Sequence, residues 1–130
     1  MLDHVSLGVS NLARSRRFYD AALRPIGLVR ILDFEGRGCD YGAMAGPLGV
    51  EFTITEEEMP LTMPGMHVCF RAQDHASVRR FHHAAIAAGG LDDGAPGLRA
   101  KYHAHYFGAF VRDPDGQRIE AVCHLPADAD

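Results

Sequence analysis

Four side chains able to ligate a metal ion stand at matching places in the two halves of this 130-residue chain. His4 and His67 each open a strand-like run, and Glu51 and Glu120 each lie in the last such run of their half. Two neutral imidazoles and two carboxylates match a divalent cation in charge, and a nitrogen and oxygen set without thiolate suits an open, catalytic type of site. The pattern predicts a site for nickel, zinc, manganese, iron or cobalt, held by at least three of the four.

Each of these residues also has an ordinary structural explanation. A single histidine at the start of a strand is usually a satisfied or exposed residue. Glu51 alone could be an edge charge that blocks aggregation. Metal binding is favoured by the coincidence of two histidines at one repeat spacing with a glutamate that closes each repeat.

The elements that must position these four residues form one unit that occurs twice. A strand-like alternation over residues 4–9 precedes a helical stripe over residues 12–23, and both patterns return 63 positions later. Ser10 or Asn11 is expected to cap the first helix, and Asp74 the second. Short strand-like runs then follow each helix, at residues 28–34, 40–45 and 50–54 in the first half and 97–102, 106–112 and 117–123 in the second.

The predicted fold class is therefore α+β, with two β-α-β-β-β modules. The first module spans about residues 2–56 and the second about residues 65–124, with an acidic, proline-bearing linker between them. At this length, residues 1–130 are expected to form a single domain with a real core.

Glu120 lies on the return strand of a predicted β-hairpin. Proline second and glycine fourth in Asp113-Pro114-Asp115-Gly116 favour a type I turn. Strand alternation sets Glu120 opposite to its neighbours Ile119 and Ala121 and on the face of Val122. We therefore expect Glu120 to face a cavity, where a buried carboxylate requires a compensating charge.

Composition excludes several classes of function. A formal charge of −4 without a basic cluster argues against nucleic acid as a partner. No apolar run approaches the roughly 18 residues of a membrane span, and no signal peptide is visible. The three cysteines lack metal-motif spacing and are interpreted as free thiols in a reducing cytoplasm. The chain is predicted to be cytoplasmic, with no membrane partner.

Several motifs together resemble one known family. They are the opening His4-Val5-x-Leu7-x-Val9 with Arg17-Phe18-Tyr19, then Val50-Glu51-Phe52, His67-Val68-x-Phe70 and Asp113-Pro114-Asp115-Gly116-x-x-Ile119-Glu120. From Leu2 to His124 the chain resembles the vicinal oxygen chelate superfamily, which includes glyoxalase I, extradiol dioxygenases, fosfomycin and bleomycin resistance proteins, and methylmalonyl-CoA epimerase. The resemblance implies a curved mixed sheet around a cavity.

The resemblance also implies roles for the four residues. His4, His67 and Glu120 match metal ligands that most metal-dependent members share, and Glu51 matches a fourth ligand of glyoxalase I-like members. There the metal stabilises an enediolate while a glutamate moves the proton, which makes Glu51 and Glu120 the catalytic candidates. The prediction is a metal-dependent glyoxalase I-like lyase or isomerase that acts by proton transfer on a small, metal-chelating oxygenated substrate.

Departures from the family pattern and two alternatives qualify this prediction. Gly8 and Thr55 stand where bacterial glyoxalase I carries an arginine and an asparagine for glutathione, so strict lactoylglutathione lyase activity is not expected. An Fe(II) extradiol-type dioxygenase would need only His4, His67 and Glu120. A non-catalytic protein that sequesters an antibiotic or metabolite would need none of the ligands.

A polar segment before the hairpin is the predicted substrate-binding region. Arg99 or Lys101 would bind an anionic group, and Tyr102, His103 or Tyr106 would serve as hydrogen-bond or acid–base partners.

Small members of the superfamily are commonly homodimers, which leaves two arrangements of the metal site open. It lies within one chain, or it is shared so that His4 and Glu120 belong to a different subunit's site than His67 and Glu51.

Overall fold

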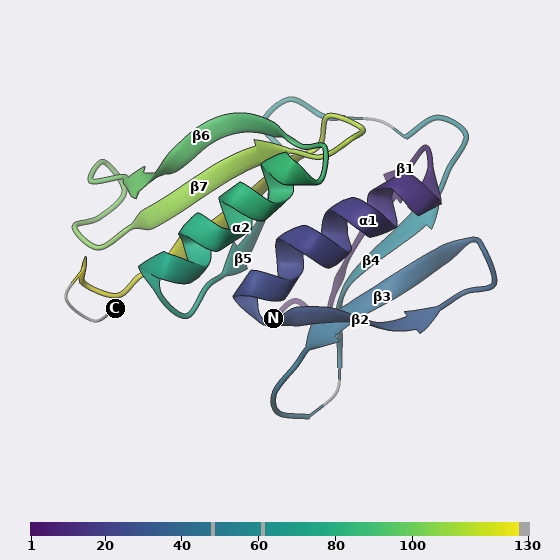
Figure 1. Cartoon of the computed structure of the whole chain (residues 1–130), viewed down its shortest axis with the longest axis horizontal. Coiled ribbons are helices and arrows are strands. Elements are labelled where there is room, and N and C mark those ends of the chain that lie inside the picture. The colour runs from purple at the N-terminus through teal and green to yellow at the C-terminus, as the bar shows by residue number, and fades with distance from the viewer. Residues whose placement is uncertain (48, 61, 128–130) are drawn as a thin grey trace.

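Each half of the chain folds as a strand, a helix and three further strands. The computed structural model describes residues 1–47, 49–60 and 62–127, and within them it contains two four-stranded sheets (Figure 1). The first module comprises β1 (Val5–Val9), α1 (Leu12–Leu23), a short 3-10 helix (Arg24–Ile26), β2 (Leu28–Asp33), β3 (Gly38–Ala43) and β4 (Val50–Glu56). The second comprises β5 (Val68–Arg71), α2 (His75–Ala87), β6 (Leu91–Leu98), β7 (Phe107–Arg112) and β8 (Arg118–Cys123).

The two sheets have the same topology. Their strand orders are β1-β4-β3-β2 and β5-β8-β7-β6, so the first and last strands of each module are neighbours. These two strands pair in parallel in each module, whereas the remaining pairs are antiparallel. Figure 1 shows both helices on one side of the sheets, beside each other. The predicted α+β fold with two β-α-β-β-β modules is confirmed.

Both helices begin where their capping residues predict. The Asn11 side chain accepts a hydrogen bond from the Arg14 N–H at 2.9 Å, and the Asp74 carboxylate accepts one from the Ser77 N–H at 2.6 Å. These acceptors satisfy backbone N–H groups that have no partner inside the helix. Asn11, rather than Ser10, therefore caps α1.

A large apolar core lies between the helices and the two sheets, with a smaller cluster beside it around Val78 and Phe107. Phe52 and Phe70, from different modules, meet edge to face with ring centroids 5.3 Å apart. The same core contains Leu7 of β1 and Ile119 of β8. Because side chains alternate along a strand, the intervening residues of β1, β4, β5 and β8 point away from the helices. That second face carries the predicted metal ligands.

The hairpin turn is held by its first aspartate. The Gly116 N–H donates to the Asp113 carbonyl at 2.8 Å, and the N–H groups of Asp115 and Gln117 both donate to Asp113 Oδ1 at 2.9 Å. Gly116 has φ +84°, a conformation that glycine adopts without steric cost. The predicted β-hairpin is confirmed.

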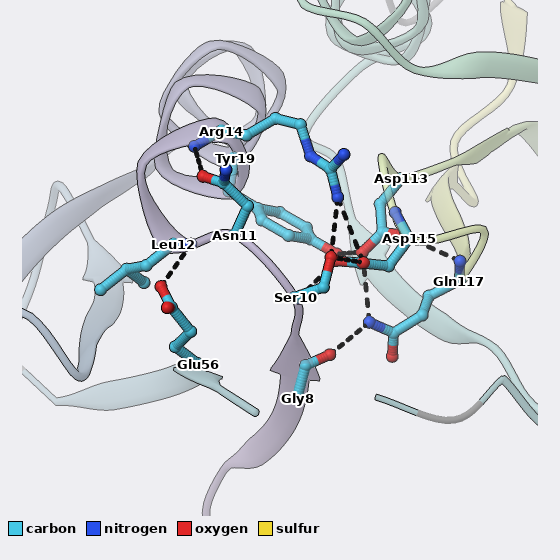
Figure 2. Close-up of polar contacts among 10 residues, drawn as sticks. All are labelled: Gly8, Ser10, Asn11, Leu12, Arg14, Tyr19, Glu56, Asp113, Asp115 and Gln117. Atoms are coloured by element: carbon cyan, nitrogen blue, oxygen red, sulfur yellow. Dashed lines mark hydrogen bonds and ion pairs between the residues drawn. The ribbon is translucent and has the colours of Figure 1, made fainter. Parts of the chain in front are cut away.

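The same turn fastens the second module to the first (Figure 2). The Tyr19 hydroxyl of α1 donates to Asp113 Oδ2 at 2.6 Å in the protein interior. Arg14 forms an ion pair with Asp115 at 3.2 Å, and the Ser10 hydroxyl donates to the same carboxylate. Burial raises the pKa of Asp113, although the Tyr19 hydrogen bond opposes this. The turn is therefore a joint between the modules.

The second strand of the second module differs from the prediction. β6 spans Leu91–Leu98 instead of residues 97–102, and residues 99–106 form a turn-containing loop. Gly94 and Pro96 lie inside this strand, and its pairing with β7 shifts register on both sides of Gly94. An edge strand accommodates proline and glycine at such bulges, which explains why a run that looked like a loop is a strand.

Candidate functional site

The second half of the predicted metal site is a buried carboxylate with three polar neighbours. Glu120 is only 1% exposed. His67 Nε2 lies 3.0 Å from its Oε2 atom, and the Tyr106 hydroxyl donates to its Oε1 atom at 2.5 Å. Cys69 stands directly opposite Glu120 in the β5–β8 register. Glu120 is thus buried away from bulk water, with an imidazole and a hydroxyl as its side-chain partners.

A glycine makes room for this arrangement. A Cβ atom at Gly108 of β7 would lie 3.1 Å from Glu120 Oε1 and 3.2 Å from Tyr106 Cε1. The missing side chain lets the tyrosine ring reach across β7 to the carboxylate. Burial, and then contact with Glu120, raises the pKa of Tyr106 and that of the Cys69 thiol. Both groups are therefore neutral donors at neutral pH.

The first half of the predicted site lies at the corresponding first and last strands of its own module, in a more open environment. The β1–β4 register pairs Val5 with Phe52, so His4 and Glu51 lie side by side just before them. Both line a groove of about 390 Å³, together with Cys69. Among the described residues Glu51 has no hydrogen-bond or ion-pair partner, whereas His4 Nδ1 lies 2.6 Å from Asp3.

The structure brings the four predicted ligands together only in two pairs. Within residues 1–47, 49–60 and 62–127, no group of three or more His, Cys, Asp or Glu side chains could hold a metal ion. His67 lines a small hollow with Leu7, whereas His4 lines the groove with Cys69. The two pairs therefore do not converge on one point within the described part of the chain.

This pairing corrects one expectation. A shared site was expected to take His4 with Glu120 from one subunit. The sheet register instead joins His4 to Glu51, and a 3.0 Å contact joins His67 to Glu120. The reason is that the first and last strands of the same module are neighbours, so each module supplies one histidine and its own glutamate.

Of the predicted substrate-binding residues, only Tyr106 reaches the ligand pairs. The rings of Tyr102 and His103 pack against Tyr106 with centroids 4.8 and 5.5 Å away. Arg99 donates to the Ala95 carbonyl at 2.7 Å. The Lys101 ammonium lies 5.1 Å from the Tyr102 ring centroid. These residues form the loop between β6 and β7 instead of facing the site from a strand.

Sequence reasoning missed one residue on the ligand-bearing face. Arg118 lies two positions before Glu120 on β8, so strand alternation sets both side chains on the same face. The guanidinium carbon of Arg118 stands 4.3 Å from the Phe110 ring centroid, and the ring of His67 contacts the same phenylalanine. The alternation that placed Glu120 was the signal that could have found Arg118.

Comparisons with known proteins agree on one family. Residues 1–121 match the glyoxalase/bleomycin resistance protein/dioxygenase superfamily. A glyoxalase/bleomycin resistance protein from Albidiferax ferrireducens T118 is 32% identical, with a TM-score of 0.81, covering 96% of this chain and 99% of that one. No curated protein matches in sequence. No helix in the described part of the chain has the length and apolar character needed to cross a membrane.

Two more distant structures share the fold. A glyoxalase/bleomycin resistance protein/dioxygenase family enzyme from Burkholderia phytofirmans PsJN is 15% identical, with a TM-score of 0.71 over 95% of this chain and 98% of that one. The fosfomycin resistance protein FosX from Listeria monocytogenes is 16% identical, with a TM-score of 0.69 over 96% and 93%. At such identities the likeness concerns the fold alone.

Proposed function

The chain belongs to the glyoxalase/bleomycin resistance protein/dioxygenase superfamily, and from this premise we propose that it is a metal-dependent lyase or isomerase of the glyoxalase I type. It would move a proton within a small oxygenated substrate that chelates the metal. The observation that carries the proposal is the pair formed by His67 and the buried Glu120, with a second histidine and glutamate, His4 and Glu51, side by side at the first and last strands of the other module.

The donor set fits a divalent cation. It consists of two imidazoles and two carboxylates, a combination that suits nickel, zinc, manganese, iron or cobalt. One chain gathers these donors only as two separate pairs. We therefore propose a symmetric homodimer in which His4 and Glu51 of one copy complete a site with His67 and Glu120 of the other. Each dimer then holds two equivalent sites.

The environments of the two glutamates assign them different roles. Glu120 is buried and held by the Tyr106 hydroxyl, which suits a fixed ligand. Glu51 is exposed on the groove and has no described partner, so its carboxylate is free to rotate and to carry a proton. A bound cation supplies positive charge that offsets the negative charge developing on the substrate oxygens. Glu51 is therefore the proposed base.

Mixing two defective variants tests the shared site. His4→Ala and His67→Ala should each abolish stoichiometric metal binding, because each breaks one pair in every site. After unfolding and refolding together, random heterodimers should restore about a quarter of the sites, since one of their two sites is intact. Elemental analysis of the mixture measures this. The exposed His83→Ala variant is the control and should bind metal fully.

If mixing the two variants does not restore metal binding, the shared site is wrong.

A Glu51→Gln variant distinguishes the proposed proton transfer from dioxygenase chemistry. Loss of both metal affinity and proton transfer would support the four-donor site. Iron that is bound equally well by Glu51→Gln, together with oxygen consumption in the presence of catechols, would instead support a three-ligand dioxygenase.

A further inference from the structure

Two arginines share a single carboxylate on the ligand-bearing face of the second sheet. Arg112 of β7 and Arg118 of β8 are direct partners in the strand register. Their Nε atoms lie 3.1 and 2.8 Å from the same oxygen, Asp93 Oδ2. Two guanidinium groups against one carboxylate leave one positive charge without compensation. The shared anchor also fixes the position of both side chains.

The arginine pair opens into a hollow beside the metal ligand His67. Arg112 and Arg118 line a hollow of about 350 Å³ with Met63 and Met66 of the linker. The same four residues, with His67, line a smaller hollow of about 30 Å³. A group bound by the arginines would therefore lie next to one of the proposed metal ligands, against an apolar wall of methionine side chains.

The free nitrogen atoms of the pair match an oxyanion. The Nε atom of each arginine faces Asp93, and Arg112 Nη1 donates to the Gly116 carbonyl at 3.2 Å. Among the described residues, no hydrogen bond involves the terminal nitrogens of Arg118. A guanidinium group offers parallel N–H donors that suit a carboxylate or a phosphonate in a bidentate arrangement.

We propose that Arg112 and Arg118 form a subsite for an oxyanion group, a carboxylate or a phosphonate, on the substrate. Its link to catalysis rests on the proposed function, because only then does the neighbouring His67 hold a metal. The substrate class that follows is a small anion whose metal-chelating oxygens lie beside the oxyanion group. The subsite itself does not require the metal.

Arginine side-chain resonances report on this subsite directly. In metal-free protein labelled with 15N, acetate and methylphosphonate are titrated while the Nε–H signals of Arg112 and Arg118 are followed. We expect saturable shifts with at least one of these anions and none with neutral acetamide, and the tighter binder identifies the oxyanion. Arg118→Gln should weaken binding about tenfold or more, whereas Arg17→Gln, on the exposed side of α1, should leave it unchanged.

Two results would overturn the proposal: no saturable shift with either anion, or an equal loss of binding in Arg17→Gln and Arg118→Gln. If Arg118→Gln does not give the spectrum of a folded protein, Arg112→Gln carries the same test. His4→Gln separates this inference from the proposed function, because it should remove metal binding and keep anion binding. If the native protein binds metal but not the anions, the subsite proposal is wrong and the proposed function stands. If it binds the anions but not metal, the proposed function is wrong and the subsite proposal stands.

Discussion

Replacing Tyr106 by phenylalanine removes the one hydroxyl that holds the buried Glu120 carboxylate. The hydroxyl donates at 2.5 Å to a carboxylate that is 1% exposed. Hydrogen bonds to charged groups contribute about 1.5–3 kcal/mol. Tyr106 is itself half-buried, so water can replace part of the lost interaction, and we expect a loss near 1.5 kcal/mol. For a chain of this length, that corresponds to a fall in Tm of about 5 °C.

Metal affinity gives a second readout of the same change. Outer partners of a metal ligand typically contribute 10- to 100-fold in affinity, because they fix the orientation of the ligand. If Glu120 is a ligand, Tyr106→Phe should therefore weaken metal binding by about that factor. Urea denaturation measures the stability of the metal-free protein, and competition with a chelator measures metal affinity. The stability result does not depend on the proposed function, whereas the affinity result does.

Tyr102→Phe is the matched control for the loss of a tyrosine hydroxyl. Its ring packs 4.8 Å from that of Tyr106, but it is 56% exposed and its hydroxyl has no described hydrogen bond. A surface change of this kind should alter stability by less than about 0.5 kcal/mol. Equal losses in the two variants, or no loss in Tyr106→Phe, would refute the conclusion that this hydroxyl secures Glu120.

Two further predictions concern the joint between the modules and the buried tyrosines. Tyr19→Phe removes the 2.6 Å hydrogen bond to the buried Asp113 Oδ2 atom, which then keeps only the longer 3.3 Å bond from Gln117 Nε2, and should cost about 1.5–3 kcal/mol. Combined with Asp113→Asn, the change should be less than additive in a urea-denaturation cycle. Burial raises the pKa of Tyr19 and Tyr41 above 10.0, so stability should be fully kept below pH 10 and fall above it, as the unfolded chain loses these protons first. Ultraviolet absorbance and circular dichroism during alkaline titration should therefore change together.

The sequence predicted most helices, strands and turns correctly because neighbouring residues determine where they begin and end. A capping side chain such as Asp74 acts on backbone groups three residues away, and the turn at Asp113 is closed by its own backbone and side chain. The candidate ligands were found differently, through the coincidence of residue types across a repeat. The strand register sets His4 beside Glu51, whereas His67 reaches Glu120 through a 3.0 Å side-chain contact.

The remaining features depend on contacts that local patterns do not encode. The strand β6 was placed too late because its glycine and proline residues are typical of loops, and only its edge position makes them acceptable. His75, the first residue of α2, is 2% exposed and stacks on Phe107 at 4.1 Å, a contact that no local pattern encodes. The separation of the two ligand pairs follows from how the sheets meet, which no repeat spacing specifies.

The most recognisable motif of the chain is the turn of the β7–β8 hairpin, whereas the side chains proposed to bind metal and substrate lie on the strands of that hairpin. The polar groups of the turn around Asp113 and Asp115 are occupied with closing the turn and fastening α1, so the motif identifies the fold and leaves the substrate open (Figure 2). Selectivity must come from side chains that the joint does not use. On this hairpin, Glu120 and the arginine pair Arg112 and Arg118 face the opposite side of the sheet from the helices, although Arg112 also donates to the Gly116 carbonyl of the turn. Variation at the two arginines should therefore change the substrate while leaving the fold intact.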